Sequence, residues 1–192
     1  MGFAKNEFEI HVSTMPVWQK EGDMDIFNLL KKDHKEVKSI LKKLVKTEES
    51  DTKERKALFA KFKKELVAHS RAEEDVLYSR LEETDDRSTR ELAFESAEEH
   101  DIVDHLLEKM NDLSFSDERW ASVACVLQEN LENHIKEEEG RLFTKTRKAF
   151  DKEELNLIGD EFQREKERRL KETKPGKEVY SSEDDQLGLN QY

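Results

Sequence analysis

Cysteine is almost absent from this chain of 192 residues, which contains Cys125 alone. A single cysteine excludes a disulfide within the chain and any zinc site built from several cysteines. If the chain binds a metal, the ligands must therefore be imidazole nitrogens and carboxylate oxygens. Cys125 itself falls off the apolar stripe of its predicted helix, and we expect it to be a packed thiol without a chemical role.

Glycine, proline and long apolar runs are also scarce. With 6 glycines, 2 prolines and 42% charged residues, the composition is typical of long helices with solvated outer faces. No apolar run approaches the roughly 20 residues needed to cross a bilayer, and residues 1–23 contain none of signal-peptide length. We therefore expect a soluble cytoplasmic protein that does not contact a membrane.

Basic residues are too few to balance the acidic ones. The chain has 34 lysines and arginines against 46 aspartates and glutamates, which gives a formal net charge of -12. A negative surface repels the phosphate backbone of nucleic acids. The sequence therefore predicts no nucleic-acid partner.

Apolar periodicity predicts an all-α protein with four long helices. The predicted helices span about 24–46, 51–83, 86–111 and 116–150. Polar cap candidates precede three of them, namely Asp23, then Asp86 or Ser88, then the Ser116-Asp117 pair. The connections are short, so neighbouring helices should be antiparallel, as in an up-down four-helix bundle.

The predicted domain organisation places this bundle at residues 24–150. Residues 1–23 form an N-terminal arm, and residues 151–171 contain an additional C-terminal helix with Leu155, Ile158 and Phe162 on one side. The polar composition of residues 172–192 predicts a flexible tail.

Ionisable side chains interrupt the apolar stripe of every bundle helix near its middle. The interrupting residues, in chain order, are His34, His69, Glu73, His100, His134 and Glu138. Burying such groups without compensation costs on the order of several kcal/mol each, comparable to the net stability of a domain. The pattern therefore predicts that one shared partner, a metal centre, compensates all six groups together.

An internal repeat relates the two halves of this pattern. The motifs His69-x-x-x-Glu73 and His134-x-x-x-Glu138 lie 65 positions apart, and His34 and His100 lie 66 positions apart. Histidine and glutamate at i and i+4 share one helix face, so an approximate two-fold arrangement brings both motifs to the same depth. Two divalent cations would carry four positive charges against two carboxylates, which leaves room for a bridging hydroxide.

The order and spacing of these six residues resemble the hemerythrin-like, or HHE cation-binding, domain over roughly residues 24–150. The resemblance implies two non-haem iron ions with a bridging oxo or hydroxo group. It implies that Glu73 and Glu138 bridge the two ions. It also implies that one ion is held by His34 and His69, and the other by His100 and His134.

Asp104 departs from the pattern of the oxygen-carrying members, in which a second histidine follows the first by one turn on the third helix. Asp104 is a candidate metal ligand, a candidate partner for a ligand histidine, or a solvated residue. An aspartate changes the charge and the number of open positions at that ion. Oxygen carriage is accordingly less firmly implied than iron binding.

Three functions remain open at the level of the sequence. The first is a non-enzymatic di-iron protein that binds dioxygen, another small diatomic molecule or peroxide, as a carrier, sensor or iron store. The second is a redox enzyme or iron-sulfur repair factor that acts on peroxide or nitric oxide. The third is an interaction protein in which the metal only stabilises the fold. Zinc or manganese could replace iron, because ligand type alone does not select the metal.

Overall fold

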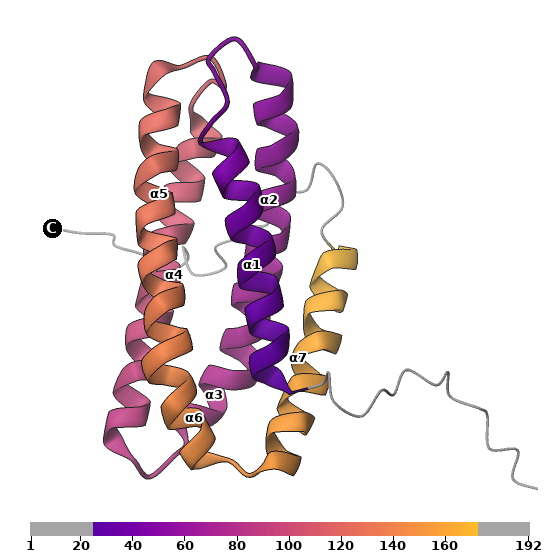
Figure 1. Cartoon of the computed structure of the whole chain (residues 1–192), viewed down its shortest axis with the longest axis vertical. Coiled ribbons are helices and arrows are strands. Elements are labelled where there is room, and N and C mark those ends of the chain that lie inside the picture. The colour runs from indigo at the N-terminus through magenta and orange to yellow at the C-terminus, as the bar shows by residue number, and fades with distance from the viewer. Residues whose placement is uncertain (1–24, 173–192) are drawn as a thin grey trace, which may run out of the picture.

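The structure, a computed structural model that describes residues 25–172, is helical throughout its regular elements (Figure 1). The all-α prediction is confirmed. The helices are α1 (Ile26–Leu44), α2 (Thr52–Glu73), α3 (Ser79–Glu82), α4 (Arg87–Asp112), α5 (Glu118–Glu137), α6 (Phe143–Ala149) and α7 (Lys152–Glu172), with π-helical turns η1 (Glu74–Tyr78) and η2 (Glu138–Leu142). The predicted arm at 1–23, and the predicted tail beyond residue 172, lie outside the described residues.

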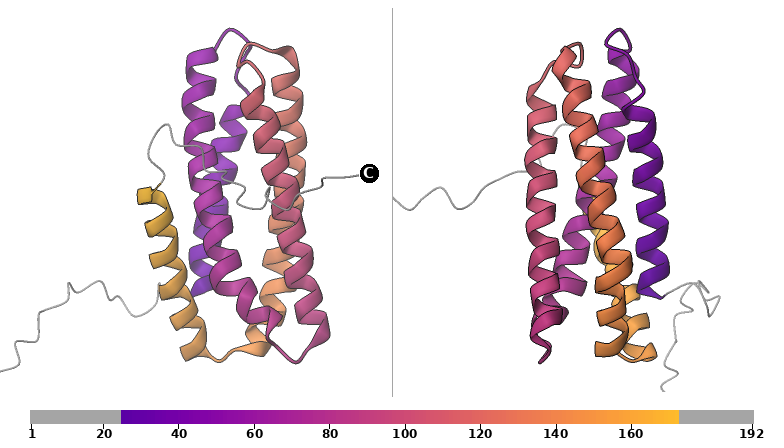
Figure 2. Two further views of the ribbon diagram at one scale, coloured as in Figure 1. Left: turned by 180° about the vertical axis from the view of Figure 1, so that it is seen from behind. Right: turned by 60° about the vertical axis from the view of Figure 1, so that its left-hand side comes forward.

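Four antiparallel rods make up the bundle. The elements α2, η1 and α3 follow one another as one continuous rod, and α5, η2 and α6 form another, while α1 and α4 are single helices (Figures 1 and 2). The additional helix α7 lies outside this bundle, against α1, α2 and η1. The predicted up-down bundle with an extra C-terminal helix is therefore confirmed.

Aspartate side chains begin three of the rods. The carboxylates of Asp25, Asp86 and Asp117 accept hydrogen bonds from the backbone N–H groups two residues later, at 2.9, 3.3 and 2.9 Å. The candidates Asp86 and Asp117 are thus confirmed as N-caps. The first helix was predicted to start at residue 24 after Asp23. It begins instead at Ile26, because the extended backbone of Asp25 places that residue's own carboxylate over the first turn.

The interior is divided into two apolar clusters with the polar residues between them. One cluster surrounds Trp120 near the α1–α2 and α4–α5 connections, and the other surrounds Phe27 and Phe143 at the opposite end. The apolar side of α1 is buried in this interior, at Phe27, Leu30, Val37, Leu41 and Leu44. No helix within residues 25–172 combines the length and the apolar character that a bilayer span requires.

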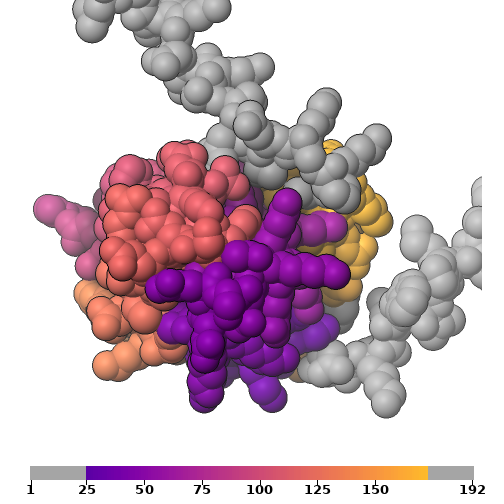
Figure 3. Space-filling view, turned by 90° about the horizontal axis from the view of Figure 1, so that it is seen from above, coloured from indigo at the N-terminus to yellow at the C-terminus, as the bar shows by residue number. Residues whose placement is uncertain are grey.

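Arg55 holds one end of the bundle together from inside. Its guanidinium donates to the backbone carbonyls of Thr47 and Phe115 at 2.8 and 2.6 Å and lies 4.8 Å from the ring centroid of Trp120. Thr47 belongs to the α1–α2 connection and Phe115 to the α4–α5 connection. These two connections lie against each other in the view down the bundle (Figure 3). Arg55 is 1% exposed, and it donates a charged hydrogen bond to both carbonyls.

Replacing Arg55 with methionine is expected to lower the free energy of unfolding by about 3 kcal/mol, because buried carbonyls lose their charged donor. Urea denaturation followed by circular dichroism measures this loss. The matched control is Lys56→Met on the exposed face of the same turn, which should change the stability by less than about 0.5 kcal/mol. Equal effects of the two substitutions would contradict the role given to Arg55.

Candidate metal centre

All six predicted ligand residues meet in the middle of the bundle. His34 comes from α1 and His100 from α4. His69 and Glu73 lie at the end of α2, whereas His134 lies at the end of α5 and Glu138 begins η2. None of the six residues is more than 3% exposed: His34, His69, Glu73, His100, His134 and Glu138. The apolar clusters above and below separate this polar layer from water.

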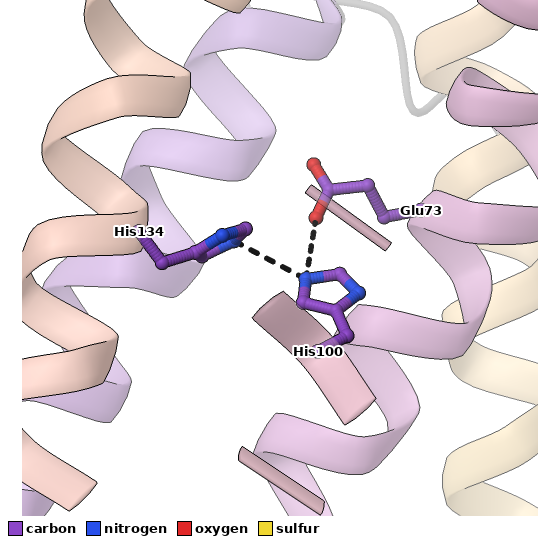
Figure 4. A group of neighbouring side chains, drawn as sticks. All are labelled: Glu73, His100 and His134. Carbon is purple, nitrogen blue, oxygen red and sulfur yellow. Dashed lines mark hydrogen bonds and ion pairs between the residues drawn. The ribbon is translucent and has the colours of Figure 1, made fainter. Parts of the chain in front are cut away.

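The imidazoles form two pairs. The ring centroids of His34 and His69 are 5.0 Å apart, and those of His100 and His134 are 4.7 Å apart. In the second pair the two Nε2 atoms face each other at 3.2 Å. Ligand atoms of Glu73, His100 and His134 all lie within 4.8 Å of one another, and Figure 4 shows these side chains converging from three helices.

Each glutamate reaches both histidine pairs. The Oε2 atom of Glu73 lies 3.4 Å from Nε2 of His69 and 3.8 Å from Nε2 of His100. The Oε2 atom of Glu138 lies 3.0 Å from Nε2 of His34 and 3.9 Å from Nε2 of His134. Each carboxylate is thus positioned between the two pairs, which is the geometry that a bridging ligand requires.

In each of the four central histidines, a carboxylate also contacts Nδ1, the ring nitrogen that faces away from the centre. In chain order, Nδ1 of His34 contacts Glu139 at 2.9 Å, Nδ1 of His69 contacts Asp33 at 3.3 Å, Nδ1 of His100 contacts Glu74 at 2.8 Å and Nδ1 of His134 contacts Glu99 at 2.8 Å. A neutral imidazole that donates from Nδ1 presents an unprotonated Nε2 to the interior. All four rings are thereby oriented as metal ligands.

These outer carboxylates follow the internal repeat. Asp33 and Glu99 precede the histidines at 34 and 100, and each binds the histidine of the next helix in its own half. Glu74 and Glu139 follow the bridging-type glutamates, and each binds a histidine of the other half. The sequence pattern was not interpreted as giving these four roles. The available signal was an acidic neighbour beside His34, His100, Glu73 and Glu138, at matching positions in the two repeats.

The π-helical turns begin at this layer. One, η1, starts directly after Glu73, and the other, η2, starts at Glu138. A π turn inserts one residue into the helical repeat and is frequent at functional sites. The helices predicted at 51–83 and 116–150 did not include these turns. Apolar periodicity does not reveal a single inserted residue.

Several buried polar atoms at the centre of the bundle have no hydrogen-bond partner among the described residues. Among the described residues, both oxygens of Glu73, both oxygens of Glu138 and Nε2 of His34 have no hydrogen-bond partner. The short His34–Glu138 approach has ion-pair distance without hydrogen-bond geometry. Burial and the neighbouring Glu138 carboxylate raise the pKa of Glu73 well above its usual value. A cation between these atoms would supply the missing partner, so the donor set fits a metal centre.

The pKa values of two outer carboxylates, Glu74 and Asp33, shift in the opposite direction. Burial acts to raise the pKa of Glu74, but hydrogen bonding and charge from His100 and Arg71 outweigh it, so the pKa lies below its usual value. The pKa of Asp33 is lowered in the same way against burial, by His69 and then Lys166. Both groups therefore stay ionised and keep accepting from the imidazoles.

Asp104 lies beside the site and not within the converging group. Its carboxylate is ion-paired with the guanidinium of Arg71, which also donates to both oxygens of Glu74 at 2.8 Å. Glu74 in turn contacts His100. Of the three alternatives for Asp104, this geometry favours support of a histidine, acting through Arg71 and Glu74.

The structure also places Cys125, which the sequence analysis considered, and Tyr78. Cys125, expected as a packed thiol, is exposed, because it points away from the apolar stripe into solvent. Tyr78 is 1% exposed and stacks on the ring of His100 at 5.5 Å between centroids. Its hydroxyl is buried without a hydrogen-bond partner in the described part of the chain.

Comparison with known proteins agrees with this geometry. Residues 25–146 match the family described as the hemerythrin HHE cation binding domain. A hemerythrin-like protein of Schizosaccharomyces pombe is 28% identical over 135 residues, which cover 70% of this chain and 66% of that protein. A protein of Nostoc sp. named DNA nickase is 28% identical over 141 residues, which cover 73% of this chain and 38% of that protein. No solved structure matches.

The chain thus spans less than two thirds of the length of either relative. The family match covers the four rods of the bundle and ends within α6. The helix α7 lies beyond the matched residues. The shared feature is therefore the bundle that carries the histidine and glutamate cluster, and the chemistry it supports is metal binding.

Proposed function

Because this chain belongs to the hemerythrin HHE cation-binding family, we propose that it is a non-haem di-iron protein whose centre binds dioxygen, as a carrier, sensor or iron store. The observation that carries this proposal is the position of the two glutamates. Each places one oxygen between a histidine of one pair and a histidine of the other. A site for two cations needs such shared ligands, whereas a site for one cation does not.

The proposed ligands divide into two equal sets. His34 and His69 would hold one ion, and His100 and His134 the other, with Glu73 and Glu138 shared. Mixed imidazole and carboxylate ligands with open positions are typical of non-haem iron. Iron bound there would supply redox chemistry and vacant positions for a small molecule.

The surrounding residues contribute by controlling water and protonation. The apolar clusters at either end exclude bulk water from the layer, which protects a bound small molecule from solvent. Outer carboxylates contact Nδ1 of each imidazole, which leaves Nε2 directed at the interior. Charge of -12 disfavours contact with a phosphate backbone, so nickase activity is not part of this proposal.

A second candidate, a redox enzyme or repair factor acting on peroxide or nitric oxide, is favoured by Asp104. Its carboxylate is occupied by Arg71, so the α4 helix offers the centre His100 and no second ligand one turn later. Fewer protein ligands leave more positions for water or peroxide. That arrangement suits turnover better than reversible carriage.

Anaerobic reconstitution tests both candidates. The chain is loaded with ferrous iron, the bound metal is counted, and oxygen is admitted while the near-ultraviolet and visible spectrum is followed. Two irons per chain and a colour that disappears on removing oxygen are expected for the carrier or sensor. Irreversible oxidation, or catalytic loss of added peroxide, would instead favour the second candidate.

Asp104→Asn serves as the control in the same experiment. It should still bind two irons, because Asp104 acts through Arg71 and not at the metal. Loss of one iron in this variant would make Asp104 a ligand. Wild-type protein that takes up no transition metal would refute the function.

A further inference from the structure

The helix α7 packs most extensively on α1, α2 and η1, the half of the bundle that carries His34 and His69. Phe162 is 1% exposed, and its ring meets the ring of His69 edge-on at 5.7 Å between centroids. Ile158 is buried on the same side of α7, one turn earlier. In Figure 2, α7 follows α1 and α2 along the outside of the bundle. The buried face of α7 therefore packs behind the pair formed by His34 and His69.

A chain of polar contacts connects α7 to the same histidine. The ammonium of Lys166 lies 2.8 Å from Oδ2 of Asp33, and that same oxygen lies 3.3 Å from Nδ1 of His69. Lys166 also approaches Glu65 of α2 at 3.5 Å. Its side chain is 14% exposed and that of Asp33 is 12% exposed, so both charges are partly withdrawn from water.

The carboxylate that corresponds to Asp33 in the other half, Glu99, is more exposed to solvent. Glu99 holds His134 as Asp33 holds His69, but the Glu99 side chain is 30% exposed. The helix α7 packs on α1, α2 and η1. Two halves that are equivalent in the internal repeat thus differ in what covers them.

Ion pairs near the middle and near the C-terminal end of α7 connect it to the bundle. Arg80 of α3 pairs with Glu161 at 2.6 Å, and Arg169 pairs with Asp75 of η1. Both partners lie on the rod that carries His69 and Glu73. A shift of α7 would therefore alter the packing against this rod.

We propose that α7 is a retaining helix that positions His69 through Phe162 and through the Lys166–Asp33 pair, and so slows metal release from the His34/His69 position selectively. Release of an ion requires a ligand to rotate away from it. Phe162 blocks the space into which the His69 ring would rotate, and Lys166 keeps Asp33 in place to hold Nδ1. No residue of α7 is expected to touch the metal. The inference depends on the two-ion centre proposed above.

The test is the rate at which the anaerobic ferrous protein loses iron to the chelator ferrozine. Wild type should release its two ions in two phases. Lys166→Met and, separately, Phe162→Leu should each accelerate the slow phase roughly tenfold, within the range typical for loss of a residue that supports a metal ligand. The fast phase should not change.

Matched variants assign the phases. Glu99→Gln removes the equivalent support from His134, so it should accelerate the fast phase only. Arg168→Met alters the outer face of α7, where Arg168 pairs with Glu165 and Glu172, and should leave both phases unchanged. Circular dichroism and metal counts confirm that each variant is folded and fully loaded before the release is started.

Three outcomes would overturn the inference. These are release of both wild-type ions at one rate, acceleration by Lys166→Met and Phe162→Leu of the same phase as Glu99→Gln, and no acceleration by either variant. Wild type that binds fewer than two irons would instead refute the di-iron function, and the inference with it.

Discussion

Loading the metal-free chain with ferrous iron is expected to raise its thermal unfolding midpoint by roughly 10 °C or more. A ligand that binds only the folded state at a thousand times its Kd contributes about 4 kcal/mol, and 1 kcal/mol corresponds to about 2–4 °C for a domain of this size. The large effect follows from the central layer, where buried carboxylate oxygens have no hydrogen-bond partner among the described residues. Differential scanning calorimetry under nitrogen measures the shift.

Chelation and a hard cation provide the controls. Adding an excess of chelator should return the midpoint to that of the metal-free protein. Magnesium should produce little shift, because it prefers oxygen ligands and four of the six proposed ligands are imidazoles. Equal shifts with magnesium and iron would point to general ionic stabilisation, and the absence of any shift with iron would argue against a buried centre.

Glu73→Gln is expected to change stability in opposite directions with and without metal. In the metal-free protein the substitution removes an uncompensated buried carboxylate and should raise the free energy of unfolding by about 2 kcal/mol. With iron present it removes a bridging ligand, so the variant should hold fewer than two ions and lose most of the thermal shift. Denaturation of both forms, with metal counts, measures both effects.

The pH dependence of this difference has a defined sign. Glu73 has a raised pKa in the folded chain because of burial first and then the Glu138 charge. Below its unfolded value of about 4.5 the group is protonated in both states and costs nothing. As the pH rises above that value, the unfolded chain ionises before the folded chain does, so wild type loses stability relative to Glu73→Gln. The gap should widen from about pH 4.5 upward and level off once the pH passes the raised pKa of the folded chain.

Glu138→Gln is the matched comparison. The Glu138 carboxylate lies 3.0 Å from Nε2 of His34. Burial acts to lower the pKa of His34, but the Glu138 charge outweighs it and leaves that pKa above its usual value. Its charge is therefore partly balanced without metal, and the gain in the metal-free variant should be smaller than for Glu73→Gln. A metal-free Glu73→Gln protein less stable than wild type would contradict this account of the centre.

The internal repeat explains why the ligand positions could be predicted. Helical periodicity placed His34, His69, His100 and His134 on inward faces, and the i, i+4 spacing placed Glu73 and Glu138 beside two of them. These relations are local to one helix, and the structure buries all six residues. Their role as ligands remains a prediction, because burial and convergence alone do not demonstrate a bound ion.

Contacts between helices could not be predicted in the same way. Glu74 and Glu139 each bind a histidine of the other half, on α4 and α1 respectively. Consecutive helical residues point about 100° apart, so a glutamate next to an inward-facing one must face a neighbouring helix. Periodicity gives that direction but does not identify the neighbour.

Helix content, inward faces and the pairing of two similar halves were thus determined by the sequence alone, because each depends on side-chain spacing along a single rod. Only the tertiary structure decided the rest: the position of each glutamate between the two histidine pairs, the carboxylate behind each imidazole, the Arg71 contact of Asp104, and the packing of α7 on one half. These depend on the rotation and depth of one helix relative to another, which are set by packing between residues distant in sequence.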